Sequence, residues 1–361
     1  MSCLDNLANI TYPIELVYNL TKLYTFRGKD FYYENVFKQY MDATIKRTIE
    51  EDTFYASKIL KLNVTDARLK LLIVKDSNPK NHEEAIVKNI KNVLTIIQEK
   101  GTELTIDDNE FLQLAIKLFQ NAKKISYDST IVETKYNLIT ERKKQSRRDQ
   151  MKLYLEKYKT CIQKSLIEPT QAITCLYIDL INTPMFTEEN DFIYLIMLYS
   201  LLFSHRFNAF KFISFFKKYY GLKNEFESAV ITSSRNWEYG TAKTEIFNTL
   251  LVETLIKCYE EVDNNVKNYY FDKSLKKQDN VEAIIIKMPK TFTKQDVKDK
   301  CPNLSDSTIR RALENLQEQG KIQSTGTGRS AKWIKIQEDE FFTPKTLQTN
   351  IFDLIGNDTD F

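Results

Sequence analysis

Apolar residues recur at intervals of three and four along most of this chain. That spacing places them on one face of a helix, and a helix that is apolar on all sides is usually buried. The helices predicted in this way span 36–62, 85–97, 107–119, 151–167, 171–181, 192–203, 224–231 and 244–262. Loops are predicted at 75–81, which contains a Ser-Asn-Pro sequence, and at the charged run 141–149. The chain is therefore expected to be mainly α.

Two short helices are predicted near the C-terminus, over 294–301 and 306–319. Thr293 and Ser305 stand immediately before them, where their hydroxyls can accept hydrogen bonds from N–H groups of the first turn. Pro302 separates the two helices, because proline cannot continue a helix. The second helix carries a narrow apolar stripe that is expected to face a core. The stripe consists of Ile309, Ala312, Leu313 and Leu316.

A hairpin is predicted after these helices, with strands at 321–324 and 331–336. The connection contains Gly326 and Gly328, which permit the positive φ of a tight turn. Two helices followed by such a hairpin are typical of a winged helix-turn-helix. The boundaries predicted here are a polar linker at 266–288, the winged helix at 289–337 and an acidic tail at 338–361.

Charges are segregated in this part of the chain. Residues 290–336 contain ten Lys and Arg against five Asp and Glu, whereas 337–361 contain one Lys against six acids. A positive helix and wing can release counterions from DNA phosphates, and the second helix of such a motif usually enters the major groove. The alternative is a winged helix that binds protein or forms a dimer. The predicted DNA contacts are Ser305, Ser307, Thr308, Arg310, Arg311, Arg329, Ser330, Lys332 and Lys335.

Whole-chain composition limits the other function classes. The net charge of +3 and the pI near 8.3 are too mild to predict nucleic-acid binding over the whole surface. Five cysteines without CxxC spacing predict reduced thiols, and the two histidines, His82 and His205, lack the spacing of metal ligands. The N-terminus lacks a signal-peptide pattern, and the most apolar run, 192–203, is too short to cross a bilayer. We expect a soluble cytoplasmic protein with no membrane partner and no metal.

An ordered series of short motifs lies between 212 and 239. It consists of Phe212-Ile213-Ser214, Phe226, Ala229-Val230, Ser233-Ser234 and Asn236-Trp237. This series resembles bacterial Fic (Fido) domain proteins that carry a C-terminal winged helix, and Ile49-Glu50 resembles the inhibitory helix of that family. The resemblance implies an all-helical Fic-like bundle followed by a small α/β winged helix domain. It also implies an N-terminal helical region at 1–80 and a Fic-like core at 81–265.

The active loop of the Fic family reads His-Pro-Phe, any residue, Asp or Glu, then Gly-Asn-Gly-Arg. An ungapped alignment places 184–192 at this loop. The positions that agree with the motif are Phe186, Glu188 and Asn190. The positions that differ are Pro184, Glu189, Asp191 and Phe192, which stand in place of the histidine, the two glycines and the arginine.

The resemblance implies what these replacements remove. In the family, the histidine takes a proton from the target hydroxyl, the glycines let backbone N–H groups surround the phosphates, and the arginine binds the terminal phosphates. The inhibitory glutamate, which corresponds to Glu50, binds that same arginine. With Phe192 at that position, Glu50 has no such partner. Glu188 could hold a magnesium ion, although an acidic residue at a helix start is commonly stabilised by the helix dipole alone. No glycine-rich segment follows His205, so this residue is interpreted as a helix-end cation.

Three hypotheses result. The first is a Fic-like protein without catalytic residues or cofactors, which dimerises or senses a protein partner and binds DNA through the winged helix. The second is an active nucleotidyltransferase that uses ATP and Mg²⁺ to attach AMP to a protein hydroxyl through a non-standard motif. The third is a protein-interaction component of a toxin–antitoxin or defence system.

Overall fold

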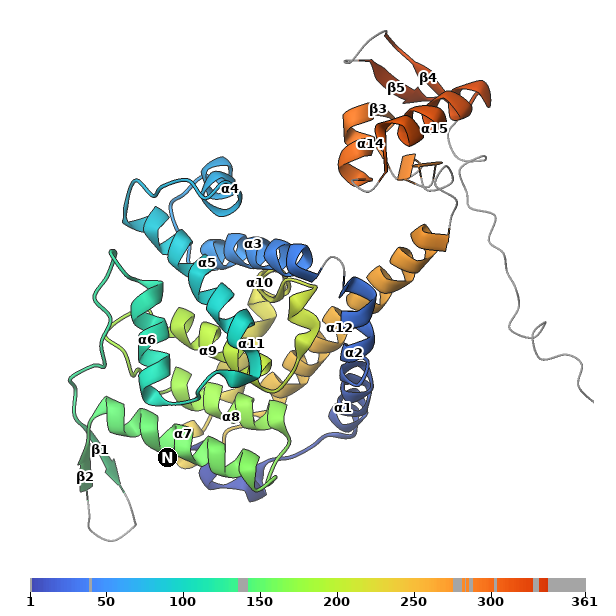
Figure 1. Ribbon diagram of the computed structural model, residues 1–361. Coiled ribbons are helices and arrows are strands. Elements are labelled where there is room, and N and C mark those ends of the chain that lie inside the picture. Colours follow the sequence, from blue (N-terminus) through green and yellow to red (C-terminus); the bar gives the residue numbers. More distant parts are fainter. Residues whose placement is uncertain are drawn as a thin grey trace, which may run out of the picture. The chain divides into compact units, whose positions relative to one another are not determined.

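The computed structural model describes residues 2–38, 41–135, 142–274, 281–282, 284–285, 288–301, 304–326 and 331–336. The chain divides into two units, Met1–Asn264 and Asn265–Phe361 (Figure 1).

Helices form nearly all of the first unit. They are α1 (Ile14–Arg27), α2 (Asp30–Phe37), α3 (Met41–Ile59), α4 (Asp66–Val74), α5 (His82–Lys100), α6 (Asp108–Leu118), α7 (Arg147–Gln163), α8 (Pro169–Ile181), α9 (Asn190–Ser204), α10 (Phe215–Gly221), α11 (Lys223–Ser233) and the first part of α12 (Glu245–Ser274). A short antiparallel hairpin joins strands β1 (Val132–Lys135) and β2 (Arg142–Gln145). The mainly α class predicted from the periodicity is confirmed.

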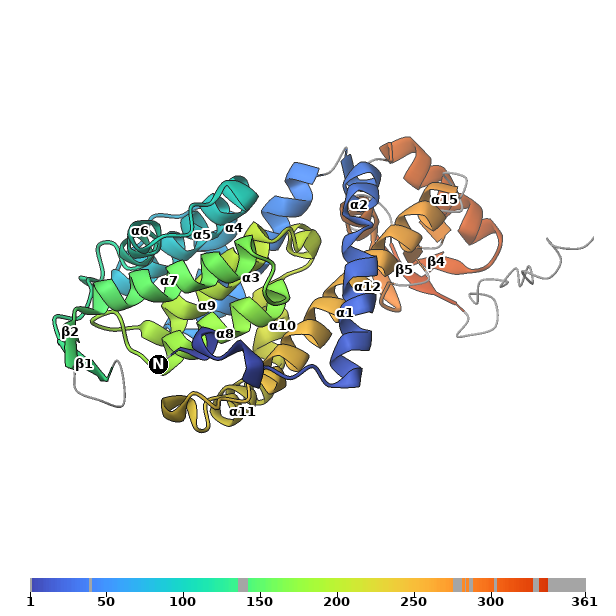
Figure 2. The same ribbon diagram turned by 90° about the horizontal axis from the view of Figure 1, so that it is seen from below.

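Helices α8 and α9 form the centre of this unit. Every residue over 170–180 and over 192–203 is buried. The second segment is almost entirely apolar, whereas the first also buries Thr170, Gln171, Thr174 and Asp179 in hydrogen bonds. In both views the remaining helices surround this pair (Figures 1 and 2). The burial explains the apolar run at 192–203. Among the described helices, none combines the length and the apolar content needed to cross a bilayer.

Several predicted boundaries are wrong. The helix predicted over 36–62 is instead two helices, because α2 ends at Phe37 and α3 begins at Met41. The run 141–149 is not a loop. It forms β2 and the first turn of α7, where the Ser146 side chain accepts a hydrogen bond from the Asp149 N–H. The predicted loop at 75–81 is confirmed. The helices that the prediction missed are α1, α2, α4 and α10.

The second unit contains a small three-stranded sheet and two helices. Its elements are β3 (Thr291–Thr293), α14 (Lys294–Lys300), α15 (Asp306–Glu318), β4 (Ile322–Ser324) and β5 (Lys332–Lys335). The strands are antiparallel in the order β3-β5-β4. The two helices and the hairpin agree with the predicted pattern, and β3 is an additional strand. Thr293 and Ser305 cap α14 and α15 as predicted, accepting from the N–H groups of Asp296 and Thr308.

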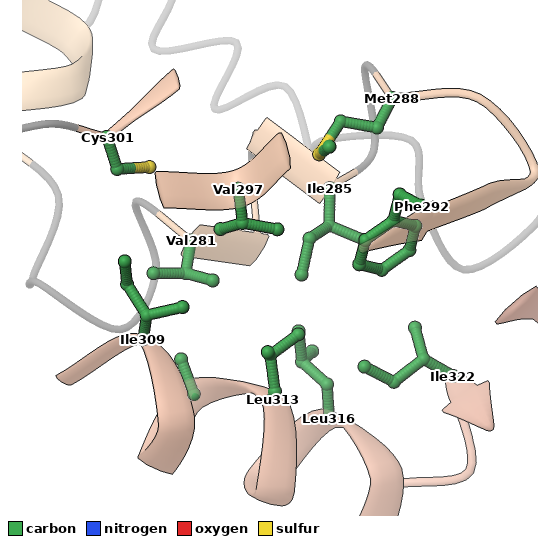
Figure 3. Close-up of a cluster of buried hydrophobic side chains, with 11 residues drawn as sticks. Val281, Ile285, Met288, Phe292, Val297, Cys301, Ile309, Leu313, Leu316 and Ile322 are labelled. Atoms are coloured by element: carbon green, nitrogen blue, oxygen red, sulfur yellow. The ribbon is translucent and has the colours of Figure 1, made fainter. Parts of the chain in front are cut away.

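A compact apolar core holds the second unit together. It contains the predicted stripe of α15 packed against Phe292, Val297 and Ile322 (Figure 3). Val281, Ile285 and Met288 are also buried in this core. Within the segment predicted as a linker, 266–288, α12 continues to Ser274, and Val281, Ile285 and Met288 belong to the core of the second unit. The acidic tail at 338–361 lies outside the described residues.

Candidate functional site

Asn190 organises the loop that joins α8 to α9. It is the first residue of α9, and its Oδ1 accepts hydrogen bonds from the backbone N–H groups of Met185 (3.1 Å) and Phe186 (2.8 Å) and from the Tyr194 hydroxyl (2.8 Å). Its Nδ2 donates to the Phe186 carbonyl at 2.8 Å. Both ends of the amide are therefore committed to the loop itself. This use of the amide requires an asparagine at the helix start and explains why this residue matches the family motif.

The backbone of the same loop pairs with a second segment. The Asp128 N–H donates to the Met185 carbonyl at 2.9 Å, and the Thr187 N–H donates to the Ser126 carbonyl at 3.0 Å. The rings of Tyr127 and Phe186 stack between these two bonds with centroids 5.2 Å apart. The loop edge from 185 to 187 is thus already occupied by the chain's own backbone.

Acidic side chains stand where the motif has glycines. Glu189 has a φ of 58°, in the left-handed region that favours glycine. Lys123 forms ion pairs with both Glu188 (3.2 Å) and Glu189. The hydrogen bond to Glu189, reinforced by the bond to Glu188, raises the pKa of the Lys123 ammonium. Glu189 thus has a backbone conformation typical of glycine, and Lys123 offsets part of the charge of the two glutamates.

Phe192 lies in the core at the position of the motif's arginine. It is buried and meets Phe119 edge to face, with ring centroids 6.5 Å apart. Pro184, at the position of the histidine, is exposed. No imidazole lies among the residues described for this loop or for the cleft beside it.

A cleft of about 880 Å³ opens next to the loop. The ends of α3 and α8, the start of α9, and helices α10 and α11 form its walls. The charged residues in its lining are Lys61, Glu189, Asp191, Lys223 and Glu227. Lys223 pairs with Glu227 at 3.6 Å, and Glu189 pairs with Lys123, so Lys61 and Asp191 are the lining charges without an ion pair among the described residues. This nearly neutral surface differs from the positive surface that holds a triphosphate.

No protein-family model matches the sequence, and neither does any curated protein. The structure does match a Fic family protein from Desulfovibrio desulfuricans G20, with a TM-score of 0.54 at 12% identity over 91% of this chain and 98% of that protein. This chain has the fold of the Fic proteins. A Fic domain containing signaling protein from Bacteroides thetaiotaomicron VPI-5482 matches 69% of this chain and 97% of its own length, with a TM-score of 0.55 at 14% identity.

The Fic fold confirms the resemblance noted in the sequence, at the level of architecture. Glu50 lies on α3, as expected for the inhibitory-helix-like segment, but the α3 side of the cleft is lined by Ile59, Leu60 and Lys61. The Glu50 Oε1 is buried and has no hydrogen-bond partner among the described residues. The ion pair between Glu50 and an arginine at position 192 is absent, because Phe192 occupies that position.

Neither histidine lies in the loop at 184–192 or in the lining of the cleft. His205 follows α9, and its Nε2 lies 2.6 Å from the Tyr158 hydroxyl. Burial, with a smaller effect of Arg27, lowers the pKa of His205 to about 4. The interpretation of His205 as a helix-end cation is therefore wrong, because the ring is neutral at pH 7. His82 begins α5, and its Nδ1 lies 2.6 Å from the Asn121 carbonyl oxygen.

The predicted DNA contacts on α15 lie around its first two turns. Ser305 Oγ contacts the hydroxyls of Ser307 and Thr308, at 2.8 Å in each case. Arg310 and Arg311 are exposed, and Arg310 Nε donates to Glu314 at 2.7 Å. The serines and Thr308 thus shape the helix start, while the arginines point away from the buried stripe.

Two of the four DNA contacts predicted on the hairpin, Lys332 and Lys335, lie within the described residues. Lys332 is exposed on β5. Lys335 donates from Nζ to the Met288 carbonyl at 2.6 Å, and burial lowers its pKa. The Lys335 side chain is thus directed into its own unit. Arg329 and Ser330 lie outside the described residues.

The sequence analysis missed a second buried polar cluster, at Asp52. Asp52 lies on α3, two residues after Glu50, and joins three helices of the Fic fold. Its Oδ1 accepts from the Ser214 hydroxyl (2.6 Å) and the Phe216 N–H (3.0 Å), and its Oδ2 accepts from the Tyr199 hydroxyl (3.3 Å). A signal was present, because Asp52 stands between Ile49 and Ala56 at helical spacing, on the face that the apolar residues direct inward.

Proposed function

We propose that this protein is a Fic-fold regulator that binds DNA through its second unit, a winged helix, and does not transfer nucleotides. One observation supports the DNA-binding half most directly. Helix α15 buries Ile309, Ala312, Leu313 and Leu316 and exposes two adjacent arginines on its other side.

The exposed face of α15 suits a nucleic-acid phosphate backbone. Arg311 has no ion-pair partner among the residues that the structure describes, and Arg310 is held only by the exposed Glu314. Exposed pairs of this kind contribute little, so a phosphate can replace the carboxylate. The helix follows a short first helix and precedes an antiparallel hairpin, the order in which the second helix of a winged helix enters the major groove.

The non-enzymatic half rests on the loop before α9. Asn190 and the edge from 185 to 187 are engaged within the protein, and Asp191 in the first turn of α9 would repel a triphosphate at the helix N-terminus. Phe192 offers no group that binds phosphate. A cleft of useful size remains, but its lining supplies no imidazole base and no glycine-rich phosphate cradle.

A salt-dependent titration tests DNA binding. The full-length chain is expected to bind mixed duplex DNA at 50 mM salt, and Arg311→Ala is expected to lower the slope of log K against log salt by about 1. Fluorescence anisotropy of labelled DNA measures both. Lys70→Ala is the control, because Lys70 is an exposed cation on α4 of the first unit. Equal slopes for the wild type and Arg311→Ala, or no binding at low salt, contradict the proposal.

Labelled ATP tests the absence of nucleotide transfer. We expect no self-labelling of the full-length chain in the presence of Mg²⁺, because the loop lacks an imidazole base and a cation for the terminal phosphates. A Fic family protein with an intact motif serves as the positive control. Mg²⁺-dependent labelling that unlabelled ATP competes away would support the nucleotidyltransferase hypothesis instead.

A further inference from the structure

The outer face of α1 and α2 is apolar and exposed. Ile14 is 90% exposed, Tyr18 70% and Phe31 75%, while Val17 and Tyr32 are about half exposed. The buried residues Leu16, Leu20 and Leu23 hold α1 to the unit through its opposite face. Helix α1 is therefore apolar on two sides, and only one of these sides packs against the rest of the unit.

The two helices present this face as one continuous surface. Gly28, between them, has right-handed helical angles, and its N–H still donates to the Tyr24 carbonyl at 3.0 Å. The Tyr33 N–H in turn donates to the Lys29 carbonyl at 3.0 Å. In both views α2 continues in nearly the direction of α1 (Figures 1 and 2). The exposed positions fall at a seven-residue repeat, which is the spacing of a helix–helix seam. They are Ile14, Thr21, Gly28 and Asn35, with Tyr18, Thr25 and Tyr32 between them.

The residues in the middle of this seam have small, uncharged side chains. Thr21 and Thr25 donate their hydroxyls to the carbonyls of Val17 (3.0 Å) and Thr21 (2.9 Å), so the hydroxyls are satisfied within α1. Gly28 is not required by its own backbone, since its φ is −59° and a Cβ would meet only carbonyl oxygens at 3.5 Å. A small residue there leaves room for the close approach of another helix.

Most charges beside the seam are neutralised within the chain, the exception being the exposed Glu15 in the first turn of α1. Lys22 pairs with Glu260 at 2.6 Å, and Lys211 pairs with Glu34 at 3.0 Å. Lys29 pairs with Asp263 at 3.4 Å. A partner with the same surface would therefore meet little like-charge repulsion along the seam.

We propose that this seam, Ile14 to Asn35, is the interface of a homodimer in which α1 and α2 of two copies pack antiparallel about a two-fold axis. The positions are symmetric about the midpoint of the seam, so Tyr18 of each copy faces Phe31 of the other and Thr21 faces Gly28. Bulky side chains then lie at both ends and small ones at the crossing. A two-fold contact of this kind uses the same patch on both copies.

The exposed apolar area is adequate for such a contact. An aromatic side chain presents roughly 150–250 Å², and the seam carries Tyr18, Phe31 and Tyr32 together with Ile14 and Val17. This exceeds the few hundred Å² that soluble monomers usually expose in one patch, and it approaches the roughly 800 Å² per partner of a standard interface. The seam lies wholly in the first unit, so this proposal does not depend on DNA binding.

The mass of the full-length chain in solution, without DNA, tests the interface. Sedimentation equilibrium is expected to give twice the chain mass of 42.5 kDa. Val17→Arg is expected to weaken the dimer at least tenfold, because it places two charges in an apolar seam. Val74→Arg on α4 is the matched control, since Val74 is also an exposed valine in a helix (56% against 49% for Val17), and it should leave the dimer unchanged.

A charge swap tests the antiparallel arrangement. Tyr18→Glu alone should dissociate the dimer, and adding Phe31→Lys in the same chain should restore it, because the two new charges meet across the two-fold axis. Circular dichroism confirms that each variant is folded. A wild-type monomer at all concentrations, or a dimer that Val17→Arg leaves intact, overturns the interface. Failure of Phe31→Lys to restore the dimer overturns the antiparallel pairing, whatever the DNA titration shows.

Discussion

The difference in stability between the wild type and Asp52→Asn is expected to change by up to about 4 kcal/mol between pH 4 and pH 7. Asp52 is fully buried, and burial raises its pKa from 3.8 to about 7, although hydrogen bonds from Ser214, Phe216 and Tyr199 oppose the rise. The folded state therefore holds a proton that the unfolded state releases. Its contribution to stability is fully present below pH 3.8 and is lost as the pH rises through 7.

Asparagine at position 52 has no charge to bury, so the variant lacks this pH dependence. It also loses part of the hydrogen bonding to Ser214 and the Phe216 N–H, which lowers its stability by a similar amount at every pH. Urea denaturation at pH 4.5, 6 and 8 measures the free energy of unfolding of both proteins. The informative quantity is the difference between these two free energies as a function of pH. Asp42→Asn, at an exposed position on the same helix, is the control. A difference that stays constant across this range means that Asp52 remains ionised in the fold.

The location of Asp52 connects this titration to the cleft. Asp52 joins α3 to the first turn of α10 and to Tyr199 of α9. The end of α3, Tyr219 of α10 and the start of α9 all line the cleft. Ionisation of the Asp52 carboxyl thus affects the contacts among three helices that form walls of the cleft. The pH experiment therefore also measures how strongly Asp52 stabilises the packing of these helices.

Segments whose pattern is decided locally were predictable from the sequence. The run at 192–203 could only be a buried helix, since it is apolar on every side and ends before a polar turn. Helix α15 was equally clear, because a capping serine, one apolar stripe and a glycine after its end agree with one another. In the second unit, propensity and packing favour the same structure.

Segments decided by tertiary contacts were missed. Helix α1 has apolar residues on two faces, so its periodicity is weak although Leu16, Leu20 and Leu23 are correctly spaced. Strand β2 is composed of charged and polar residues, and only pairing with β1 makes it a strand. The polarity of the stretch at 263–274 suggested a linker, yet it contains neither glycine nor proline, and α12 continues through it.

For the candidate site, the ungapped alignment pointed to a loop that lies beside a cleft, but it did not give the contacts made within that loop. The residue types at 184–192 show what chemistry is missing, because proline and phenylalanine offer neither an imidazole base nor a cation for phosphate, and glutamate carries a negative charge. The type alone does not show that Asn190 bonds to its own loop, that Lys123 neutralises the two glutamates, or that Lys335 is directed into its own unit. Each of these depends on a contact with a residue distant in sequence.

Asn190→Ala is expected to lower the free energy of unfolding by about 2–4 kcal/mol. The substitution leaves the N–H group of the buried Phe186 without its side-chain acceptor and the Phe186 carbonyl without the Asn190 Nδ2 donor. The Met185 N–H loses one of two acceptors and keeps the Tyr194 hydroxyl at 2.8 Å, while that hydroxyl keeps the Thr183 carbonyl at 3.2 Å. Equilibrium denaturation measures the loss. Asn190→Asp keeps the acceptor oxygens and loses only the donor, so a smaller decrease is expected.

Asn92→Ala provides the matched control, because Asn92 is exposed on α5 and alanine is the better helix former there. Its stability should be unchanged or slightly raised. A wild-type stability for Asn190→Ala would mean that the loop does not depend on this amide. If the expected loss is found, any activity that disappears in Asn190→Ala cannot be assigned to nucleotide chemistry, because the same substitution disrupts the loop that forms one wall of the cleft.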